Sequence, residues 1–444
     1  MRGPSRLAVL AGPESSLTPA EIARSADGFV DLWFLLDAAD SGVPGQALHM
    51  VASALAPTAV VDFTDFGACR DAVRAAGAMA VTTFSDRYCP LAARLSAEIK
   101  GASVAWPAWG RKDVQRRMLR AAGVSKVESA EIGGRGSLRS FVRAVGLPVV
   151  VKPTGGAASR DTWLLATESD ISEFLRLSGD GGARTGMFAE RFIVGEPPVA
   201  AHLADYVSAE VFRFAAAGQA SENLFSHAFV TDRLVPAWPC RETGLVLPSA
   251  MAPDRQESVI AVARKALDAL SADVGAFHVE VKPGRPSPEV IEVNGRLGGF
   301  IARLVRYGTG QDIGRLALSC ALGQYADLDL RWDRCVLVLL FQAPARADRI
   351  ERAPSRREVA RRPGVQAVDM VSPAGASVNW RGGTNLAPAW VWLAADSHAE
   401  LRGHLLDLAA FLSEEFSFVD AAGNPIRDHG WIERITRGES GGLE

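Results

Sequence analysis

The sequence AFHVEVKPGRPSPEVIEVNGRLGG, from Ala276 to Gly299, carries the clearest structural signal in the chain. Two runs that alternate apolar and polar residues flank a turn rich in proline and glycine, which predicts a β-hairpin. If the hairpin is symmetric about Pro286, Glu280 lies directly opposite Glu292 on one face. That polar face also carries His278, Lys282 and Asn294, while the face expected in the core carries Phe277, Val279, Val281, Ile291 and Val293.

The opposed glutamates predict a cation site. Like charges directly opposite each other destabilise a pair of strands, so a cation is expected between them. Glu280, Glu292 and the amide oxygen of Asn294 are hard oxygen donors, which suit Mg²⁺ or Mn²⁺. The alternative is an ordinary solvated hairpin face on which Lys282 neutralises the acids.

Three further elements suit a phosphorylated ligand. Arg296 lies in the glycine-rich turn that follows the hairpin, where a guanidinium can bind a phosphoryl group or a carboxylate. An apolar strand ends at Lys152 and opens into a loop of small residues, Gly155 to Arg160, whose backbone amides could surround phosphates. The strand from Met187 to Glu196 could offer polar groups to a purine and ribose. Each element taken alone is also explained as a surface loop or strand.

The composition favours small-molecule partners. The chain has 444 residues, 48% of them hydrophobic, and a formal net charge of −3, so a nucleic-acid partner held by bulk electrostatics is not expected. No apolar run approaches the roughly 20 residues that cross a bilayer, so we expect no membrane partner and a soluble, cytoplasmic protein. The five cysteines are scattered singly and are expected to be reduced. The sequence leaves open whether the chain forms a homodimer.

The chain divides into three regions by its pattern. In the first hundred residues, short apolar runs alternate with helical stretches, which predicts an open, mainly parallel sheet. The predicted strands are Leu7–Ala11, Val30–Leu36, Ala59–Phe63, Ala78–Thr82 and Ser103–Trp106. The turn from Gly12 to Ser16 lacks the Gly-x-Gly-x-x-Gly spacing of a dinucleotide site. A connector helix is predicted from Asp113 to Ala122, and the segment after about Asp327 is typical of an α+β unit.

In this order and spacing, the elements resemble the ATP-grasp superfamily over roughly residues 111–323. The resemblance implies an α/β ATP-grasp fold with a Rossmann-like N-terminal domain, a two-lobed core and a C-terminal α+β domain. The implied bounds are 1–110, 111–326 and 327–444, with a connector helix at 111–123, a small lobe at about 124–194 and a large lobe at about 195–326. It also implies ATP and Mg²⁺ (or Mn²⁺) as cofactors.

The resemblance assigns roles to individual residues. It implies that Lys112 and Lys152 contact the ATP phosphates, and that Gly155, Gly156 and Ser159 belong to a mobile phosphate loop. Glu190, Phe192 and Ile193 would form the adenine-facing hinge, with Glu196 or Asp205 as the ribose-contacting acid. The implied metal ligands are Glu280, Glu292 and Asn294. Arg296 and Lys152 would be catalytic, with Arg296 meeting an acyl phosphate, whereas the role of His278 is left open.

Within that superfamily the chain is similar to L-amino acid ligases of actinobacterial natural-product pathways, through His278 to Lys282 and the Arg-Leu-Gly-Gly run at 296–299. This implies an ATP-dependent carboxylate–amine ligase acting on amino acids or peptides. The implied substrate-binding residues are Arg241, Glu242, Gly244, Arg296, Gly298 and Gly299. Leu245 stands where such ligases often have histidine, so we expect a more apolar pocket wall. The alternatives are a ligase or carboxylase of central, nucleotide-type metabolism and a non-catalytic nucleotide-binding protein.

Overall fold

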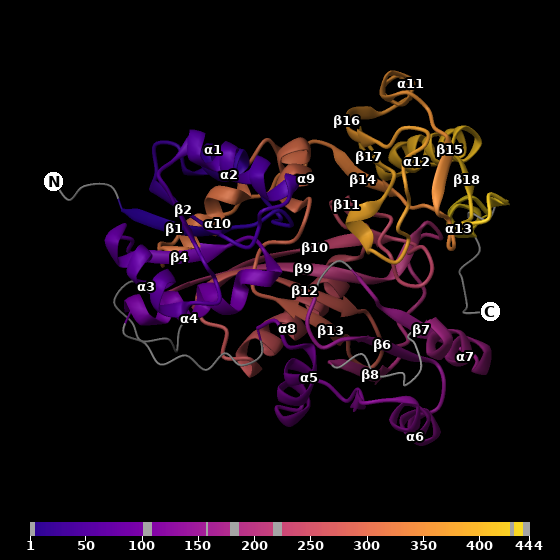
Figure 1. The fold of residues 1–444 in the computed structure, drawn as a ribbon, viewed down its shortest axis with the longest axis horizontal. Helices are drawn as coiled ribbons and strands as arrows, with labels where there is room; N and C mark the ends of the chain where they lie inside the picture. The colour runs from indigo at the N-terminus through magenta and orange to yellow at the C-terminus, as the bar shows by residue number, and fades with distance from the viewer. Residues whose placement is uncertain are drawn as a thin grey trace.

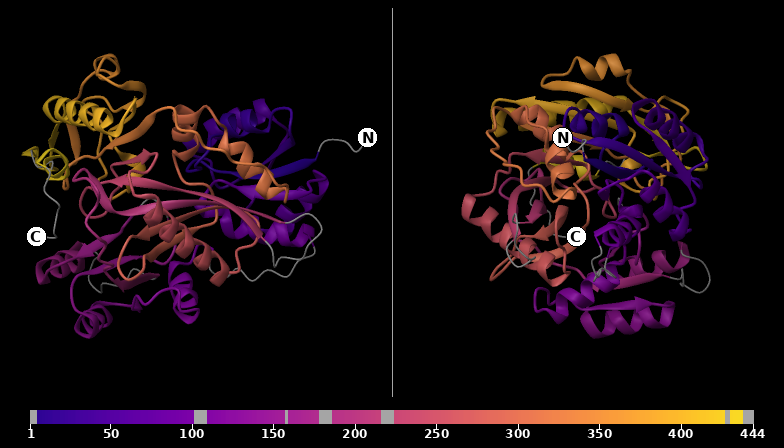
Figure 2. Two further views of the ribbon diagram at one scale, coloured as in Figure 1. Left: turned by 180° about the vertical axis from the view of Figure 1, so that it is seen from behind. Right: turned by 90° about the vertical axis from the view of Figure 1, so that its left-hand side faces the viewer.

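The computed structural model describes residues 5–100, 109–156, 159–177, 186–215, 224–426 and 430–437. The strand predicted at Ser103–Trp106 lies outside the described residues. Long strands cross the middle of the molecule, with the indigo N-terminal sheet and the yellow C-terminal segment above them and a small purple sheet below (Figures 1 and 2). Among the helices described, none combines the length and the apolarity that a membrane span requires.

The N-terminal region forms a four-stranded parallel sheet with strand order β3-β2-β1-β4. Its strands are β1 (Arg6–Ala11), β2 (Asp31–Asp37), β3 (Thr58–Val61) and β4 (Ala80–Thr83). Its helices are α1 (Pro19–Ala26), α2 (Val43–Leu55), α3 (Phe66–Ala75) and α4 (Cys89–Lys100). The parallel sheet predicted from the alternating pattern is therefore confirmed. The short helix η1 (Asp86–Tyr88) follows β4 and points its first residue toward the site described below.

A small antiparallel sheet, with order β5-β8-β6-β7, follows the connector helix α5 (Lys112–Ala121). Its strands are β5 (Ser129–Ile132), β6 (Val149–Pro153), β7 (Trp163–Leu165) and β8 (Met187–Arg191). The helices α6 (Arg135–Val145) and α7 (Glu168–Leu177) bury their apolar faces against these strands. We call this unit the small sheet.

The large sheet has eight strands in the order β13-β12-β9-β10-β11-β14-β17-β16. Its strands are β9 (Leu203–Ala215), β10 (Leu224–Leu234), β11 (Gly244–Leu247), β12 (Gly275–Lys282), β13 (Glu289–Asn294), β14 (Cys335–Phe341), β16 (Val365–Val371) and β17 (Ala389–Ala395). Because β11 pairs with β14, the sheet continues across the boundary predicted between residues 326 and 327. The C-terminal segment therefore shares its backbone hydrogen bonds with the middle of the chain.

Helices cover both faces and the end of the large sheet. They are α8 (Pro253–Ala269), α9 (Ile301–Thr309), α10 (Ile313–Ala321), α11 (Arg356–Ala360), α12 (His398–Glu415) and α13 (Gly430–Arg437), with the short helix η2 at Thr384–Leu386. A further small sheet joins β15 (Arg349–Arg352), β18 (Ser417–Val419) and β19 (Pro425–Ile426). Apolar residues of α9 and α10 share one core with the N-terminal sheet, which places that sheet beside the large one.

The predicted hairpin is formed by β12 and β13, with Glu280 paired to Glu292 and His278 to Asn294. Beyond this point the register shifts, and Val281 pairs with Val290 instead of Ile291. A β-bulge of this kind leaves one residue unpaired and turns its side chain. The expectation that Ile291 enters the core was wrong, because this residue lines the cavity described below.

The connector helix α5 is bound to the exposed backbone of β13 by side chains. Gln115 donates to the Val293 carbonyl at 2.7 Å and accepts from the Val293 amide at 3.1 Å. Arg116 is 2% exposed and donates to the carbonyls of Val290 at 2.8 Å and Ile291 at 2.9 Å. Its Nε also donates to Glu190 of β8 at 3.1 Å. One guanidinium therefore joins the hairpin to the small sheet.

Replacing Arg116 with Gln should loosen this junction. The substitution leaves the buried Glu190 carboxylate with Lys152 as its one remaining cation, and breaking a buried ion pair costs about 3–5 kcal/mol. Hydrogen-exchange mass spectrometry should show faster exchange in β8 and β13. Arg117→Gln, one residue along, is the control, because Arg117 is 66% exposed and exposed pairs contribute about 0–1 kcal/mol. Equal exchange in the two variants would contradict the assigned role.

Candidate active site

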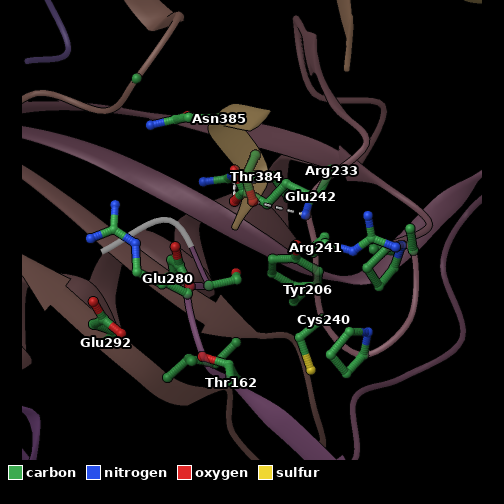
Figure 3. A pocket seen from close by; sticks show the side chains of 18 of the residues that line it. Thr162, Tyr206, Arg233, Cys240, Arg241, Glu242, Glu280, Glu292, Thr384 and Asn385 are labelled. Carbon is green, nitrogen blue, oxygen red and sulfur yellow. Dashed lines mark hydrogen bonds and ion pairs between the residues drawn. The ribbon is translucent and has the colours of Figure 1, made fainter. Parts of the chain in front are cut away.

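A cavity of about 1820 Å³ lies where the N-terminal sheet, the small sheet, the large sheet and the C-terminal segment meet. Hairpin residues Glu280 and Glu292 line one part of it, and Tyr206, Arg233 and Glu242 line another (Figure 3). Most residues predicted from the sequence border this one cavity. They are Lys112, Lys152, Gly155, Gly156, Ser159, Glu190, Phe192, Ile193, Glu196, Arg241, Glu242, Glu280, Glu292, Asn294, Arg296 and Gly299.

The two opposed glutamates share the cavity with a lysine from α5. Lys112 forms an ion pair with Glu292. Burial disfavours the charged form of Lys112, but Glu292 and Glu280 outweigh it and raise the pKa of the lysine. Burial likewise disfavours charge on Glu280, yet His278, 3.6 Å away, and the charge of Arg233 lower its pKa to about 2. Both the cation and the Glu280 carboxylate are therefore charged at neutral pH.

The hairpin carries residues that could hold a metal ion. The carboxylates of Glu280 and Glu292 and the amide of Asn294 are oxygen donors on one cavity wall, which fits Mg²⁺ or Mn²⁺. In the described part of the chain, no group of three or more His, Cys, Asp or Glu side chains could hold an ion. A magnesium ion here would therefore complete its coordination with water and phosphate oxygens, as this ion commonly does.

The residues predicted to form a phosphate loop lie beside the start of α5. Gly155, Gly156 and Ser159 line the cavity, whereas Ala157 and Ala158 lie outside the described residues. The Lys112 amide donates to the Thr154 carbonyl at 2.8 Å, which joins the loop to the helix. The backbone has positive φ at Gly156 (127°) and Ser159 (56°), on either side of Ala157 and Ala158.

Lys152 and Glu190 form a buried ion pair on adjacent strands of the small sheet. The Lys152 Nζ lies 2.6 Å from the Glu190 Oε1, and both side chains are at most 7% exposed. Burial opposes ionisation of Glu190, but Lys152 and Arg116 lower its pKa. The Glu190 side chain thus orients Lys152, while its neighbours Phe192 and Ile193 line the cavity.

Both candidates for the ribose-contacting acid are engaged in ion pairs. Glu196 pairs with Arg255, and with Arg285 at 3.1 Å. Asp205 lies 2.5 Å from the Nζ of Lys282, which also lies 4.6 Å from the centre of the Phe192 ring. A ribose contact through Glu196 or Asp205 stays a prediction. Lys282 joins the hairpin to this part of the cavity.

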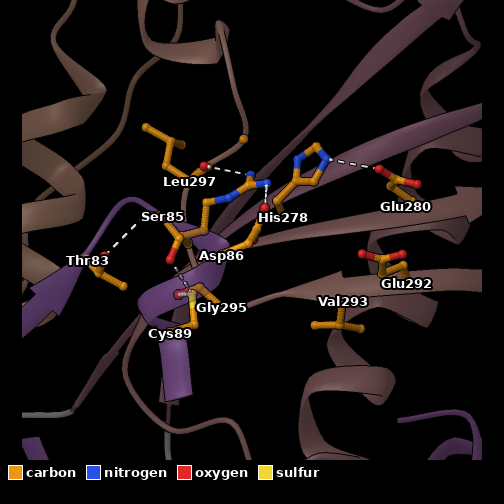
Figure 4. A network of polar contacts seen from close by, with 12 residues as sticks. Thr83, Ser85, Asp86, Cys89, His278, Glu280, Glu292, Val293, Gly295 and Leu297 are labelled. Atoms are coloured by element: carbon orange, nitrogen blue, oxygen red, sulfur yellow. Dashed lines mark hydrogen bonds and ion pairs between the residues drawn. The ribbon is translucent and has the colours of Figure 1, made fainter. Parts of the chain in front are cut away.

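Arg296 is paired with an acid that sequence reasoning missed. Asp86 of η1 accepts from Arg296, and Figure 4 shows Asp86 beside the turn that follows β13. Burial opposes the charge on Arg296, but Asp86 outweighs it and raises the pKa of the guanidinium. The two residues are 210 positions apart, and no local pattern marks Asp86. This contact brings the N-terminal region to the site.

A buried carboxylate holds the glycine-rich turn against the hairpin. Glu210 is 0% exposed, accepts from the Gly298 amide at 3.0 Å and lies 2.5 Å from His278 Nδ1. His278 is directed toward Glu280 (Figure 4). A Cβ at position 298 would lie 2.5 Å from the imidazole, so Gly298 permits this approach. We infer that Gly298 positions the turn, although a substrate contact was expected for it.

Some residues of the predicted substrate loop, residues 241–245, line the cavity, and others are buried in the core. Glu242 lines the cavity and pairs with Arg233 of β10, which also lies 2.9 Å from His278 Nε2. Gly244 lies instead in β11, where a Cβ would be 2.3 Å from the Val338 carbonyl, so strand packing accounts for this glycine. Leu245 is 1% exposed and belongs to the core. The apolar wall expected from Leu245 is therefore absent from that position.

Aromatic residues from distant segments form another part of the lining. The Phe300 ring lies 5.2 Å from Trp390 and 5.9 Å from Trp392, both on β17. Phe300 has a φ of 67°, which is unfavourable for a bulky residue and is maintained by its surroundings. The sequence placed Phe300 next to the glycine-rich turn, but only the pairing of β17 with β14 brings the tryptophans there.

The chain has an ATP-grasp fold, as its likeness to solved structures shows. The structure is similar to that of an L-amino acid ligase from Bacillus licheniformis, with a TM-score of 0.69, 19% identity, and 95% of this chain and 100% of that chain covered. It is also similar to carboxyaminoimidazole ribonucleotide synthase from Aspergillus clavatus complexed with ATP, with a TM-score of 0.64 and 15% identity. That likeness covers 98% of this chain and 99% of the other. No family model matches the sequence.

Sequence similarity to curated proteins covers at most half of this chain in the matches found, and the match of highest identity covers a fifth of it. The chain is 35% identical over 102 residues to carnosine synthase 1 of Gallus gallus. The match covers 20% of this chain and 11% of that protein, so the chain spans about a tenth of this relative.

The hairpin carboxylates should be required for binding of Mg-ATP. Saturating Mg-ATP at about 100 times its Kd should stabilise the wild-type protein by roughly 2.7 kcal/mol, seen as a higher melting temperature. Glu280→Gln and Glu292→Gln should lose most of this shift, measured for each variant against its own ligand-free melting temperature, because the substitution removes one of the two opposed carboxylates. Glu257→Gln, on the exposed side of α8, should behave as wild type. A full shift in both hairpin variants would contradict the metal assignment.

Proposed function

We propose that the protein is an ATP-dependent carboxylate–amine ligase that forms an amide bond through an acyl phosphate. The observation that carries the proposal is the grouping of Glu280, Glu292, Lys112 and Arg296 in one cavity beside a glycine-containing loop. Phosphoryl transfer depends mainly on positioning and charge neutralisation, which this group supplies without a side-chain nucleophile. The ATP-grasp fold supports the same conclusion.

The proposed reaction has two displacements. A carboxylate oxygen of the donor attacks the γ-phosphorus of ATP, the bond to the β,γ-bridging oxygen breaks, and ADP leaves. The amine nitrogen of the acceptor then attacks the acyl carbon, the bond to the phosphate oxygen breaks, and phosphate leaves as the nitrogen loses a proton to solvent. Lys112 and Lys152 hold the ATP phosphates, and Arg296 holds the transferred phosphoryl group.

The hairpin would hold the metal ion of this reaction. Glu280, Glu292 and Asn294 would bind Mg²⁺, which neutralises phosphate charge when bound. In the structure, Lys112 forms an ion pair with Glu292. An ATP phosphate would be a second anionic partner for this lysine.

We propose an amino-acid-like carboxylate as the donor and an amino acid or peptide as the amine acceptor. Glu242 offers a carboxylate to a substrate ammonium group. Phe300, Trp390 and Trp392 offer an apolar surface in the cavity that Arg296 also lines, which suits a bulky side chain, including a non-proteinogenic one. The names of two similar proteins, L-amino acid ligase and carnosine synthase, support this substrate class.

The same proposal divides the chain functionally. Residues 1–110 contribute Asp86, residues 111–326 contribute the ATP and metal groups, and residues 327–444 contribute the tryptophans of the cavity wall.

Turnover should release ADP and phosphate and should require a divalent cation. Chromatography of the nucleotide products, across a panel of amino acids and short peptides, checks this directly. Removing the metal with EDTA should stop the reaction, and adding Mg²⁺ should restore it. AMP and pyrophosphate as products would contradict the proposal. A requirement for bicarbonate or a ribonucleotide would favour an enzyme of nucleotide-type metabolism.

Arg296→Lys should lower kcat by about 100-fold, the effect of losing one preorganised transition-state donor. Lysine keeps the charge but cannot make the paired hydrogen bonds of a guanidinium. Steady-state kinetics should show little change in the KM for ATP. The control is Arg306→Lys on α9, a residue outside the cavity lining. Equal kcat values for the two variants would exclude a specific role for Arg296.

A further inference from the structure

The basic residues of the cavity fall into two groups by their partners. Ten lysine and arginine side chains line it within the described part of the chain. Eight of them lie within ion-pair distance of a carboxylate, for example Lys112 at Glu292 and Arg303 at Asp369. Arg241 and Arg434 have no such partner among the residues described. Among the described residues, these two guanidiniums are therefore the cavity cations without a carboxylate partner.

Both arginines are held by one loop. Arg241, which is 3% exposed, donates to the Trp238 carbonyl from Nε at 3.1 Å and from Nη2 at 2.9 Å, and to Gln342 at 3.3 Å. Arg434 of α13 donates to the Pro236 carbonyl at 2.6 Å. These neutral acceptors fix the guanidiniums but do not compensate their charge.

Burial supports the same conclusion. It lowers the pKa of Arg241 to about 10 and also lowers the pKa of Arg434, with no opposing contribution from a carboxylate. A buried charge without a counter-ion is costly, and buried charges are usually paired. An anionic ligand would supply the missing charge.

Arg241 lies away from the hairpin carboxylates. Figure 3 shows Arg241 on the far side of Tyr206 from Glu280 and Glu292. The phosphates have their own cations, Lys112 and Lys152, at the hairpin and the phosphate loop. Trp431, one turn of α13 before Arg434, adds an aromatic surface to this end of the cavity.

We propose that Arg241 and Arg434 bind the carboxylate that the amine acceptor keeps after ligation. This inference rests on the proposed ligase function and narrows its acceptor to amino acids or peptides with a free carboxylate. The donor carboxylate is consumed at the phosphate, so it cannot be the ligand that neutralises this pair. The acceptor carboxylate takes no part in bond formation and needs a cation away from the reacting atoms.

Matched pairs of acceptors test the proposal. Each α-amino acid is compared with its amide, for example alanine with alaninamide, at a pH where both amines are free. The wild-type enzyme should use the acids with a kcat/KM at least about tenfold above that of the amides, which corresponds to roughly 1.4 kcal/mol. In Arg241→Gln and Arg434→Gln this preference should disappear through a higher KM for the acids, while the KM for ATP stays constant.

Two further variants serve as a conservative replacement and as a control. Arg434→Lys retains the charge and should keep part of the preference for the acids. The Arg434 variants also keep the proposal testable if the variant at the buried Arg241 fails to fold. Arg349→Gln, an exposed arginine of β15, is the matched control and should keep the full preference. An unchanged preference in both glutamine variants would overturn this inference alone. A raised KM for ATP would overturn it in favour of a phosphate contact, and absence of ADP release with every donor would overturn the ligase function as well.

Discussion

The binding of α5 to the free edge of β13 is the constraint on which the site depends. The outer side of an edge strand has amide and carbonyl groups that no neighbouring strand pairs with. Where such a strand is buried, these groups need other hydrogen-bond partners. Gln115 and Arg116 supply them, with contacts to Val293, Val290 and Ile291. The same helix places Lys112 at Glu292 and, through Arg116, holds Glu190 next to Lys152. One short helix thus sets the spacing between hairpin, phosphate loop and small sheet.

Charge pairing then organises the cavity. Its cations are matched by acids from other segments, such as Asp86 at Arg296 and Glu242 at Arg233. In the proposed reaction ATP, the metal ion and the substrates replace these internal partners. The net charge of the cavity is therefore close to zero before ligands bind. When a ligand binds, a cavity side chain exchanges an internal ion pair for one with the ligand, which limits the cost of desolvation. Among the described residues Arg241 and Arg434 depart from this pattern, and the proposal of an anionic ligand for them rests on that departure.

Local patterns were sufficient to predict the hairpin and the parallel N-terminal sheet. The pairing of Glu280 with Glu292 follows from alternation about a turn. The bulge at Ile291 could not be predicted, because it depends on how β13 meets α5. Asp86 and Arg434 were missed for a related reason: they reach the site through packing of distant segments, and no motif surrounds them. Leu245 fitted a family position but faces the core, since β11 lies between β10 and β14.

Isotope transfer from the donor carboxylate tests the central claim most directly. The donor is supplied with both carboxylate oxygens as ¹⁸O, and the released phosphate is analysed by mass spectrometry. Attack of this carboxylate on the γ-phosphorus, followed by displacement by the amine, predicts one ¹⁸O atom in each phosphate and none in ADP. Label in AMP, or unlabelled phosphate accompanying amide formation, would contradict an acyl phosphate and with it the roles assigned to Lys112, Arg296 and the hairpin carboxylates.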